Sequence, residues 1–213
     1  DLVLAQNDAA RHQFDRLGVQ KDRLFVTGNL KHDPGGLPEP GPEVLEWQRL
    51  WGERPVWLAG STHRGEEAPL GQTQLQVLKQ HPDALLVVVP RYPERAAEAM
   101  QALIEAGVAA CDIEDFAESP QASAVVVGRM GVLSMLYQCI PICLVGGSLV
   151  PGPGGHNLIE PALASRPVLV GPWTETQPLA VEGLNSVGAL ITVETPDQLA
   201  ATVIDLIARP AVS

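Results

Sequence analysis

The segment Cys143–Pro161 carries the clearest indication of chemistry in this 213-residue sequence. It joins the apolar run Ile142–Val145 to two glycine-rich turns and then to a helix predicted to begin near Asn157; the turns are Gly146-Gly147-Ser148 and Gly152 with Gly154 and Gly155. A helix N-terminus offers unpaired N–H groups and a partial positive charge, and glycines let an anion come close to the backbone. The pattern therefore predicts a phosphate site, with a plain glycine turn as the alternative. Its glycine spacing matches neither the dinucleotide-binding fingerprint nor the P-loop.

The start of this predicted helix carries two polar side chains, Asn157 and Glu160. Their spacing of three residues is a capping-box pattern, which explains them as structural residues. The same spacing places both on one face of the helix start, toward the same crevice. A carboxylate there can accept hydrogen bonds from both hydroxyls of a ribose, so both residues are also candidate ligand contacts.

Another polar group follows the predicted strand Val56–Ala59, in the run Gly60-Ser61-Thr62-His63-Arg64-Gly65-Glu66-Glu67. Ligands of open α/β sheets bind at the carboxyl ends of the strands, which is where these side chains fall. A structural explanation is equally available. Ser61 or Thr62 could cap a helix that begins near Glu66, and acidic residues in its first turn favour the positive end of that helix.

Arg91 lies just after the next predicted strand, Leu85–Val89, with only Pro90 between them. A guanidinium at the end of a buried strand loses hydration unless an anion pairs with it, so Arg91 is a candidate anion-binding residue. The alternative partner within the chain is Glu94. We interpret Arg95 as a helix-surface or ion-paired arginine.

The apolar runs leave room for a helix between one run and the next, and continuous Val, Leu and Ile are typical of strands buried on both faces of a parallel sheet. The predicted strands are Leu2–Ala5, Leu24–Val26, Val56–Ala59, Leu85–Val89, Ala124–Val127, Ile142–Val145, Val168–Val170 and Leu190–Val193. Helical patterns cover Asn7–Leu17, Pro42–Trp51, Glu66–Gln80, Glu94–Ala106, Val132–Tyr137, Leu158–Ala164 and Pro196–Ala208. The alternation predicts an α/β fold with a Rossmann-like, doubly wound parallel sheet.

The composition of the chain limits which binding partners and which cellular compartment we expect for it. The net charge of -11 argues against nucleic acid or an anionic membrane surface as the partner of the chain as a whole. Cys111, Cys139 and Cys143 lack metal-ligand spacing and are interpreted as reduced core residues of a cytoplasmic protein. No apolar run approaches the ~18 residues of a membrane span, and no signal peptide is recognised. Because the first residue is Asp1, we expect the chain to be cut from a longer protein.

Five ordered motifs resemble the carboxyl half of the 3-deoxy-D-manno-octulosonic acid (Kdo) transferases. They are Thr27-Gly28-Asn29-Leu30-Lys31-His32-Asp33, Ser61-Thr62-His63-Arg64-Gly65-Glu66-Glu67, Pro90-Arg91-Tyr92-Pro93-Glu94-Arg95, Val145-Gly146-Gly147-Ser148-Leu149 and Gly154-Gly155-His156-Asn157-Leu158-Ile159-Glu160-Pro161. The resemblance extends from Asp1 to about Ala208. It implies one half of a two-domain GT-B glycosyltransferase that transfers Kdo from CMP-Kdo to a lipid A precursor at the cytoplasmic face of the bacterial inner membrane. It implies neither a metal nor a cofactor besides the donor substrate.

The resemblance also implies a division of the chain. Residues 1–33 would be the end of the amino-terminal acceptor domain, 34–43 a linker rich in proline and glycine, and 44–213 the donor-binding domain. The family's general base, a glutamate, and its membrane-facing helices belong to the half that would precede Asp1. We therefore expect this chain alone to bind the donor without transferring it.

By the same resemblance, Arg91 neutralises the phosphate or carboxylate of the donor and assists its departure electrostatically. Hydrogen bonds to the donor come from Ser61 and Thr62, while Asn157 and Glu160 hold phosphate and ribose. The remaining expected donor neighbours are His63, Pro90, Met130, Gly131, Gly146, Gly147 and Ser148. Met130 and Gly131 are expected beside the base.

Two loops depart from the family pattern. The family's Gly-Asp-Thr-x-Gly-Glu-Leu is replaced by Gly128-Arg129-Met130-Gly131-Val132-Leu133, which lacks the acids, and Gly-Pro-His-Thr-Phe-Asn is replaced by Gly171-Pro172-Trp173-Thr174-Glu175-Thr176. These departures leave two alternatives open. One is a GT-B protein that uses another nucleotide sugar, such as a UDP-sugar transferase or epimerase, and the other is a nucleotide-binding or interaction module without catalysis.

Overall fold

A computed structural model of the chain describes residues 2–28 and 36–209. It divides into two compact units, Asp1–Gly36 and Leu37–Ser213. Residues 29–33 of the first motif and residues 34–35 of the expected linker lie outside the described residues. At the other end of that linker, helix α2 begins at Pro42, so the last two residues assigned to the linker are helical.

The smaller unit pairs two short strands in parallel, β1 (Val3–Ala5) with β2 (Leu24–Val26). Between them lie helix α1 (Asp8–Arg16) and a 3₁₀ turn, η1 (Lys21–Arg23). Asn7 fixes the start of α1, because its side-chain oxygen accepts a hydrogen bond from the Ala10 N–H at 2.8 Å. The described part of this unit is thus a single β–α–β motif.

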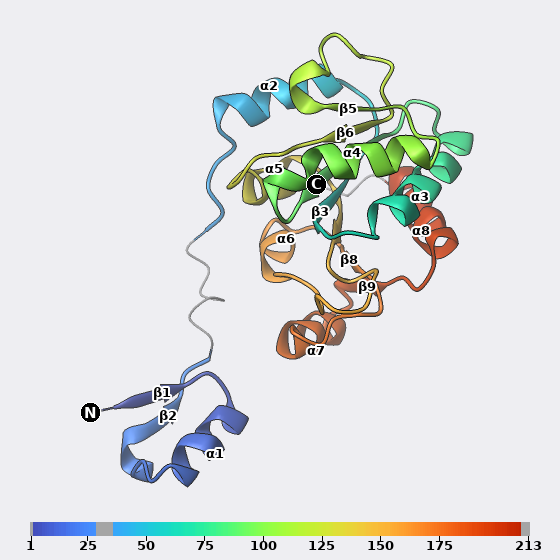
Figure 1. Cartoon of the computed structure of the whole chain (residues 1–213). Coiled ribbons are helices and arrows are strands. Elements are labelled where there is room, and N and C mark those ends of the chain that lie inside the picture. The colour runs from blue at the N-terminus through green and yellow to red at the C-terminus, as the bar shows by residue number, and fades with distance from the viewer. Residues whose placement is uncertain (1, 29–35, 210–213) are drawn as a thin grey trace. The chain divides into compact units, whose positions relative to one another are not determined.

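The larger unit is built on a seven-stranded parallel sheet with the order β5-β6-β4-β3-β7-β8-β9 (Figure 1). The strands are β3 (Val56–Thr62), β4 (Leu85–Pro90), β5 (Ala110–Asp112), β6 (Ala124–Val126), β7 (Ile142–Val145), β8 (Val168–Val170) and β9 (Leu190–Thr192). The predicted doubly wound parallel sheet is confirmed. Strand β3 lies between β4 and β7, so the chain switches direction across the sheet there, and ligands of such sheets bind at this switch point.

Helices cover both faces of the sheet (Figure 1). They are α2 (Pro42–Trp51), α3 (Glu67–Gln80), α4 (Ala96–Glu105), α5 (Leu133–Cys139), α6 (Ile159–Leu163), α7 (Pro178–Ser186) and α8 (Pro196–Ala208), with short 3₁₀ turns η3 (Pro93–Arg95) and η4 (Ile113–Asp115). Within the described part of the chain, no helix combines enough length with enough apolar character to cross a membrane.

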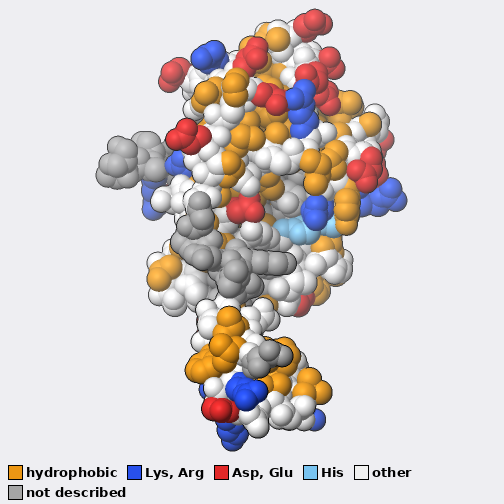
Figure 2. Space-filling view, turned by 90° about the vertical axis from the view of Figure 1, so that its left-hand side faces the viewer, with side chains coloured by type: hydrophobic (Ala, Val, Ile, Leu, Met, Phe, Trp, Pro, Cys, Tyr) orange, Lys and Arg blue, Asp and Glu red, His pale blue; other side chains and the backbone are white. Residues whose placement is uncertain are grey.

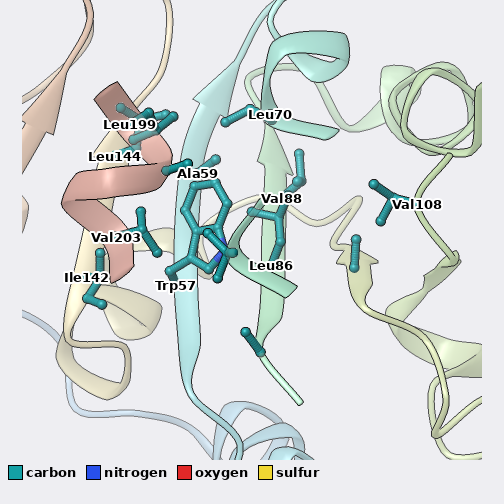
Figure 3. Close-up of a cluster of buried hydrophobic side chains, with 14 of the residues drawn as sticks. Trp57, Ala59, Leu70, Leu86, Val88, Val108, Ile142, Leu144, Leu199 and Val203 are labelled. Carbon is teal, nitrogen blue, oxygen red and sulfur yellow. The ribbon is translucent and has the colours of Figure 1, made fainter. Parts of the chain in front are cut away.

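Alternate residues of β3 face opposite layers, as the twofold period of a strand requires. Trp57 and Ala59 pack with residues of α3, α4 and α8, and Figure 3 shows that cluster around Trp57. Leu58 faces the other side and packs with α2 and α5. The indole N–H of Trp57 donates to the Gln74 side chain at 2.7 Å, which satisfies the buried polar atom of this central side chain.

Candidate functional site

A pocket of about 270 Å³ opens at the carboxyl edge of the sheet. Its walls come from the exits of four strands, β3, β4, β6 and β7. The lining residues are Ser61, Val89, Pro90, Arg91, Arg129, Met130, Gly131, Leu133, Tyr137, His156, Asn157 and Glu160. The structure therefore gathers most of the sequence-predicted site residues around one cavity, at the switch point of the sheet.

Ser61 enters this pocket through a bulge in β3. The pairing with β4 shifts between Gly60 and Thr62, and Ser61, the extra residue, adopts a left-handed backbone with φ 57°. Non-glycine residues rarely adopt this conformation, and such strain is concentrated at binding sites. Ser61 does not cap α3, because Glu66 is the residue before that helix and no side-chain cap is present there. The capping alternative for Ser61 and Thr62 is therefore wrong.

Arg91 is exposed at the exit of β4, and its guanidinium carbon lies 5.4 Å from the centre of the Tyr92 ring. It has no ion-pair partner among residues 2–28 and 36–209, so the alternative pairing with Glu94 is not formed. Arg95 is paired, as expected, with the nearly buried carboxylate of Glu67 at 3.1 Å and with Glu98 at 3.4 Å. Of these two arginines, Arg91 is the one whose charge is available to a ligand.

Arg129 brings a second guanidinium to the pocket wall, but its charge is neutralised within the protein. It forms ion pairs with Glu43 and with Glu114, the latter at 2.6 Å, and lies over the Trp47 ring. This explains how the chain accommodates an arginine where the family motif has an acid. Beside it, Met130 is 69% exposed and Gly131 has φ 80°, a conformation that suits glycine.

Asn157 and Glu160 lie together at the start of α6. The Asn157 side-chain oxygen accepts from the Ile159 N–H at 2.9 Å, and its amide group donates to Glu160 at 2.9 Å. The other carboxylate oxygen of Glu160 accepts from the Ser134 hydroxyl at 2.6 Å. Leu158 holds the N-cap position of α6 without a side-chain cap, so the capping box is not formed, and Asn157 makes only a local bond to the Ile159 N–H. Glu160 links α6 to α5 and lines the pocket.

Two histidines meet at the edge of the pocket. Their Nε2 atoms are 2.7 Å apart, and the rings of His63 and His156 are nearly parallel, with centroids 4.9 Å apart and 12° between the planes. Burial is the main cause that lowers the pKa of both rings, that of His156 to about 4. The pair therefore favours neutral imidazoles. Figure 2 shows histidine side chains beside a basic side chain on this unit's surface.

The glycine-rich turn after β7 is already occupied by an anion of the protein itself. Glu66, which is fully buried, accepts four backbone hydrogen bonds. One oxygen accepts from His63 and Gly147, each at 2.8 Å, and the other from Ser148 at 3.0 Å and Leu149 at 2.8 Å. This turn is therefore not the predicted phosphate site, because its N–H groups already donate to the carboxylate of Glu66.

The expected donor neighbours Thr62, Gly146, Gly147 and Ser148 do not line the pocket. A Cβ on Gly146 would come within 2.8 Å of the Ser61 carbonyl oxygen, so glycine is required for the contact between β3 and β7. The Thr62 hydroxyl donates to Glu67 at 3.2 Å, and the Ser148 hydroxyl donates to the Val145 carbonyl at 2.5 Å. These buried hydroxyls are bonded within the protein, so the structure gives them a supporting role and not the expected donor contact.

Five pocket residues were not among the site residues predicted from the sequence: Val89, Arg129, Leu133, Tyr137 and His156. Leu133 and Tyr137 fell in an apolar helical pattern, which is ordinarily a core signal. His156 was visible in the motif Gly154–Pro161, but nothing in its spacing pointed to His63. Among the described residues, no group of three or more His, Cys, Asp or Glu side chains is placed to hold a metal ion.

Comparison with known proteins relates this chain to one family. Over 197 residues it is 32% identical to the 3-deoxy-D-manno-octulosonic acid transferase of Haemophilus influenzae, covering 91% of this chain and 46% of that protein. It is 32% identical over 220 residues to the transferase of Bordetella pertussis, covering 99% of this chain and 50% of that protein. The chain thus spans about half the length of these relatives. No family model matches the chain.

Solved structures give the same relationship. The C-terminal CMP-Kdo binding domain of WaaA from Acinetobacter baumannii superposes with a TM-score of 0.68 at 25% identity, covering 79% of this chain and 91% of that domain. A putative UDP-N-acetylglucosamine 2-epimerase from Listeria monocytogenes superposes with a TM-score of 0.59 at 16% identity, covering 98% of this chain and 51% of that protein, which shows a shared fold. The resemblance drawn from the sequence motifs is confirmed.

Proposed function

This chain is a homologue of the 3-deoxy-D-manno-octulosonic acid (Kdo) transferases, and we propose that it forms the part of such an enzyme that binds the donor, CMP-Kdo. The observation that carries the proposal is the position of Arg91. Its charge stands at the exit of β4, on the wall of the pocket, without an ion-pair partner in the described residues. A free guanidinium in a cleft of an acidic protein suits a ligand phosphate or carboxylate.

The other pocket residues complement a nucleotide. Ser61 lines the same pocket as Arg91, and Glu160 offers carboxylate oxygens that can accept from ribose hydroxyls. Met130 and Gly131 provide an exposed apolar side chain and backbone groups next to which a flat base fits. The volume of about 270 Å³ lies near the lower end of typical ligand pockets, about 300–1,000 Å³. It accommodates part of a nucleotide sugar, and the rest of the donor extends out of it.

In the complete enzyme, the acceptor hydroxyl of a lipid A precursor would attack the anomeric carbon of Kdo from the opposite face. Its proton would pass to a general-base glutamate in the other half of the protein, and CMP would leave with the electrons of the broken bond. Arg91 and Ser61 would stabilise the departing phosphate, as prearranged donors do for developing charge. This division makes the present chain a donor-binding half without transferase activity, and membrane contact a property of the other half.

Titration calorimetry with CMP and UMP tests the proposal. We expect CMP to bind the chain with a dissociation constant between about 1 μM and 1 mM, which corresponds to about -8 to -4 kcal/mol, and UMP to bind more weakly. UMP binding equal to or tighter than CMP binding would favour a UDP-sugar enzyme, the alternative that the shared fold with the epimerase supports. Absence of nucleotide binding, even with the missing half restored, would favour a module without catalysis.

A further inference from the structure

We infer that the hydroxyl of Tyr137 hydrogen-bonds directly to an oxygen atom of the nucleotide that fills this pocket. The inference rests on the proposed function for the identity of the nucleotide, CMP. The existence of the contact rests on the surroundings of the phenol alone.

Tyr137 is an almost fully buried residue that also lines the pocket. It lies in α5, is only 2% exposed, and packs in the same core cluster as Leu136 and Cys143. It nevertheless lines the cavity, next to Leu133 of the same helix. Among the described residues its hydroxyl has no hydrogen-bond partner, although nearly every other part of the side chain is covered by protein.

Gly60 makes this placement of the hydroxyl possible. A Cβ at Gly60 would lie 2.8 Å from the Tyr137 hydroxyl oxygen and 2.7 Å from a Leu133 methyl carbon. A side chain at this point of β3 would therefore force Tyr137 and Leu133 out of their present positions. The glycine therefore leaves space at the end of the strand, next to the bulged Ser61, and the phenol group occupies it.

Neighbouring polar groups do not satisfy the phenol. Glu160, whose charge acts on the phenol, accepts from Ser134 and Asn157 and forms no hydrogen bond with Tyr137. Burial raises the pKa of Tyr137 well above its ordinary value, and the charge of Glu160 acts in the same direction. The hydroxyl hence keeps its proton and acts as a donor. A ligand oxygen in the pocket can therefore accept the hydrogen bond that this hydroxyl does not donate within the described part of the protein.

Tyr137→Phe is an isosteric test, because it removes one oxygen atom and leaves the ring in place. We expect the dissociation constant of CMP to rise about 3- to 10-fold, the effect of one neutral hydrogen bond. The melting temperature of the free protein should stay the same or rise. Tyr92→Phe is the matched control, since Tyr92 is the chain's other tyrosine and its hydroxyl lies outside the pocket lining; its CMP affinity should match wild type.

Titrating each variant with CMP, cytidine, UMP, AMP and GMP separates failure of this inference from failure of the proposed function. Weaker binding of CMP and cytidine alike places the contact on the nucleoside, and weaker binding of CMP alone places it on the phosphate. If wild type prefers another nucleotide and Tyr137→Phe weakens that one, the donor assignment fails and the contact stands. Unchanged affinity in Tyr137→Phe for whichever nucleotide binds best would overturn the inference, as would absence of binding by all five compounds.

Discussion

The Nε2 atoms of His63 and His156 lie 2.7 Å apart, so that a single proton is shared between two imidazole rings. One nitrogen donates and the other accepts, which requires at least one ring to be neutral. Charged and titratable groups surround the pair: Glu66, Glu67, Arg91, Tyr92 and Arg95. Gly147 leaves space for the ring of His156, because a Cβ there would lie 2.9 Å from its Cδ2. Full protonation of both rings would break this contact.

The pair predicts a loss of stability in mild acid. Folding lowers the pKa of both rings, mainly through burial, and that of His156 falls to about 4 from an unfolded value near 6.5. Between those values the unfolded chain binds more protons than the folded one, so this stabilisation is complete above about pH 6.5 and is lost as the pH falls toward 4. We expect the fall in melting temperature between pH 7 and pH 4.5 to be smaller in His156→Asn than in wild type.

The control is His81→Asn, which changes a histidine at the end of α3 that is not among the pocket-lining residues. Its melting temperature should follow the wild-type pH profile. An identical acid response in His156→Asn and wild type would show that the carboxylates of this acidic protein, and not the histidine pair, govern the response.

Glu66 predicts a large stability effect at a residue that does not line the pocket. Glu66→Gln replaces one carboxylate oxygen with an NH₂ group, which then faces two backbone N–H donors. Two charge-assisted hydrogen bonds are lost, and at about 1.5–3 kcal/mol each we expect the free energy of unfolding to fall by about 3 kcal/mol or more. Urea denaturation measures this change. Glu94→Gln, at an exposed glutamate, is the control and should change stability by less than about 0.5 kcal/mol.

The fold was largely predictable because the central strands are uninterrupted apolar runs. One strand and one α-helix were missed. Strand β5, Ala110–Asp112, has three half-buried residues and no apolar run, because it lies at the edge of the sheet. Helix α7, Pro178–Ser186, buries only Ala180 and contains Gly183, which weakens the helical pattern.

The site was partly predictable, because in a parallel sheet the strand exits converge. That rule brought together Ser61, Arg91 and Glu160, which are far apart in sequence. It could not show that the carboxylate of Glu66 would cross to the glycine turn 81 residues later and bind its amides. Such a contact depends on the backbone conformation of two loops. The residue types alone would allow Glu66 several other partners.

The position of Arg91 predicts that removing its side chain weakens nucleotide binding without lowering the stability of the fold. Arg91→Ala should leave the melting temperature near wild type, because no ion pair is lost, and should strongly weaken CMP binding. In a reconstituted full-length enzyme we expect kcat/KM to fall by ~100-fold or more, the effect of losing one well-placed donor. Arg91→Lys keeps the charge but loses the planar fork, so we expect an intermediate loss.

Arg95→Ala is the matched contrast. It removes the partner of Glu67, whose side chain is 2% exposed, and a buried charge left unpaired destabilises a protein by about 3–5 kcal/mol. Since the Arg95 side chain is itself 15% exposed, we expect a loss of about 3 kcal/mol at most. A stable Arg91→Ala protein that binds CMP like wild type would remove Arg91 from the site.

The position of Glu160 in the pocket predicts that nucleotide affinity depends on the ribose hydroxyls. Its carboxylate lines the pocket while it accepts from Ser134 and Asn157, and each oxygen retains a lone pair for a further donor. Glu160→Gln exchanges one oxygen for a donor and so loses a charge-assisted hydrogen bond, worth roughly 1.5–3 kcal/mol, to a ribose hydroxyl. We therefore expect CMP affinity to fall by about 10-fold or more and 2′-deoxy-CMP affinity to fall less. If both affinities stay at wild type and only the melting temperature drops, Glu160 merely braces Asn157 at the start of α6, and the ribose is bound elsewhere.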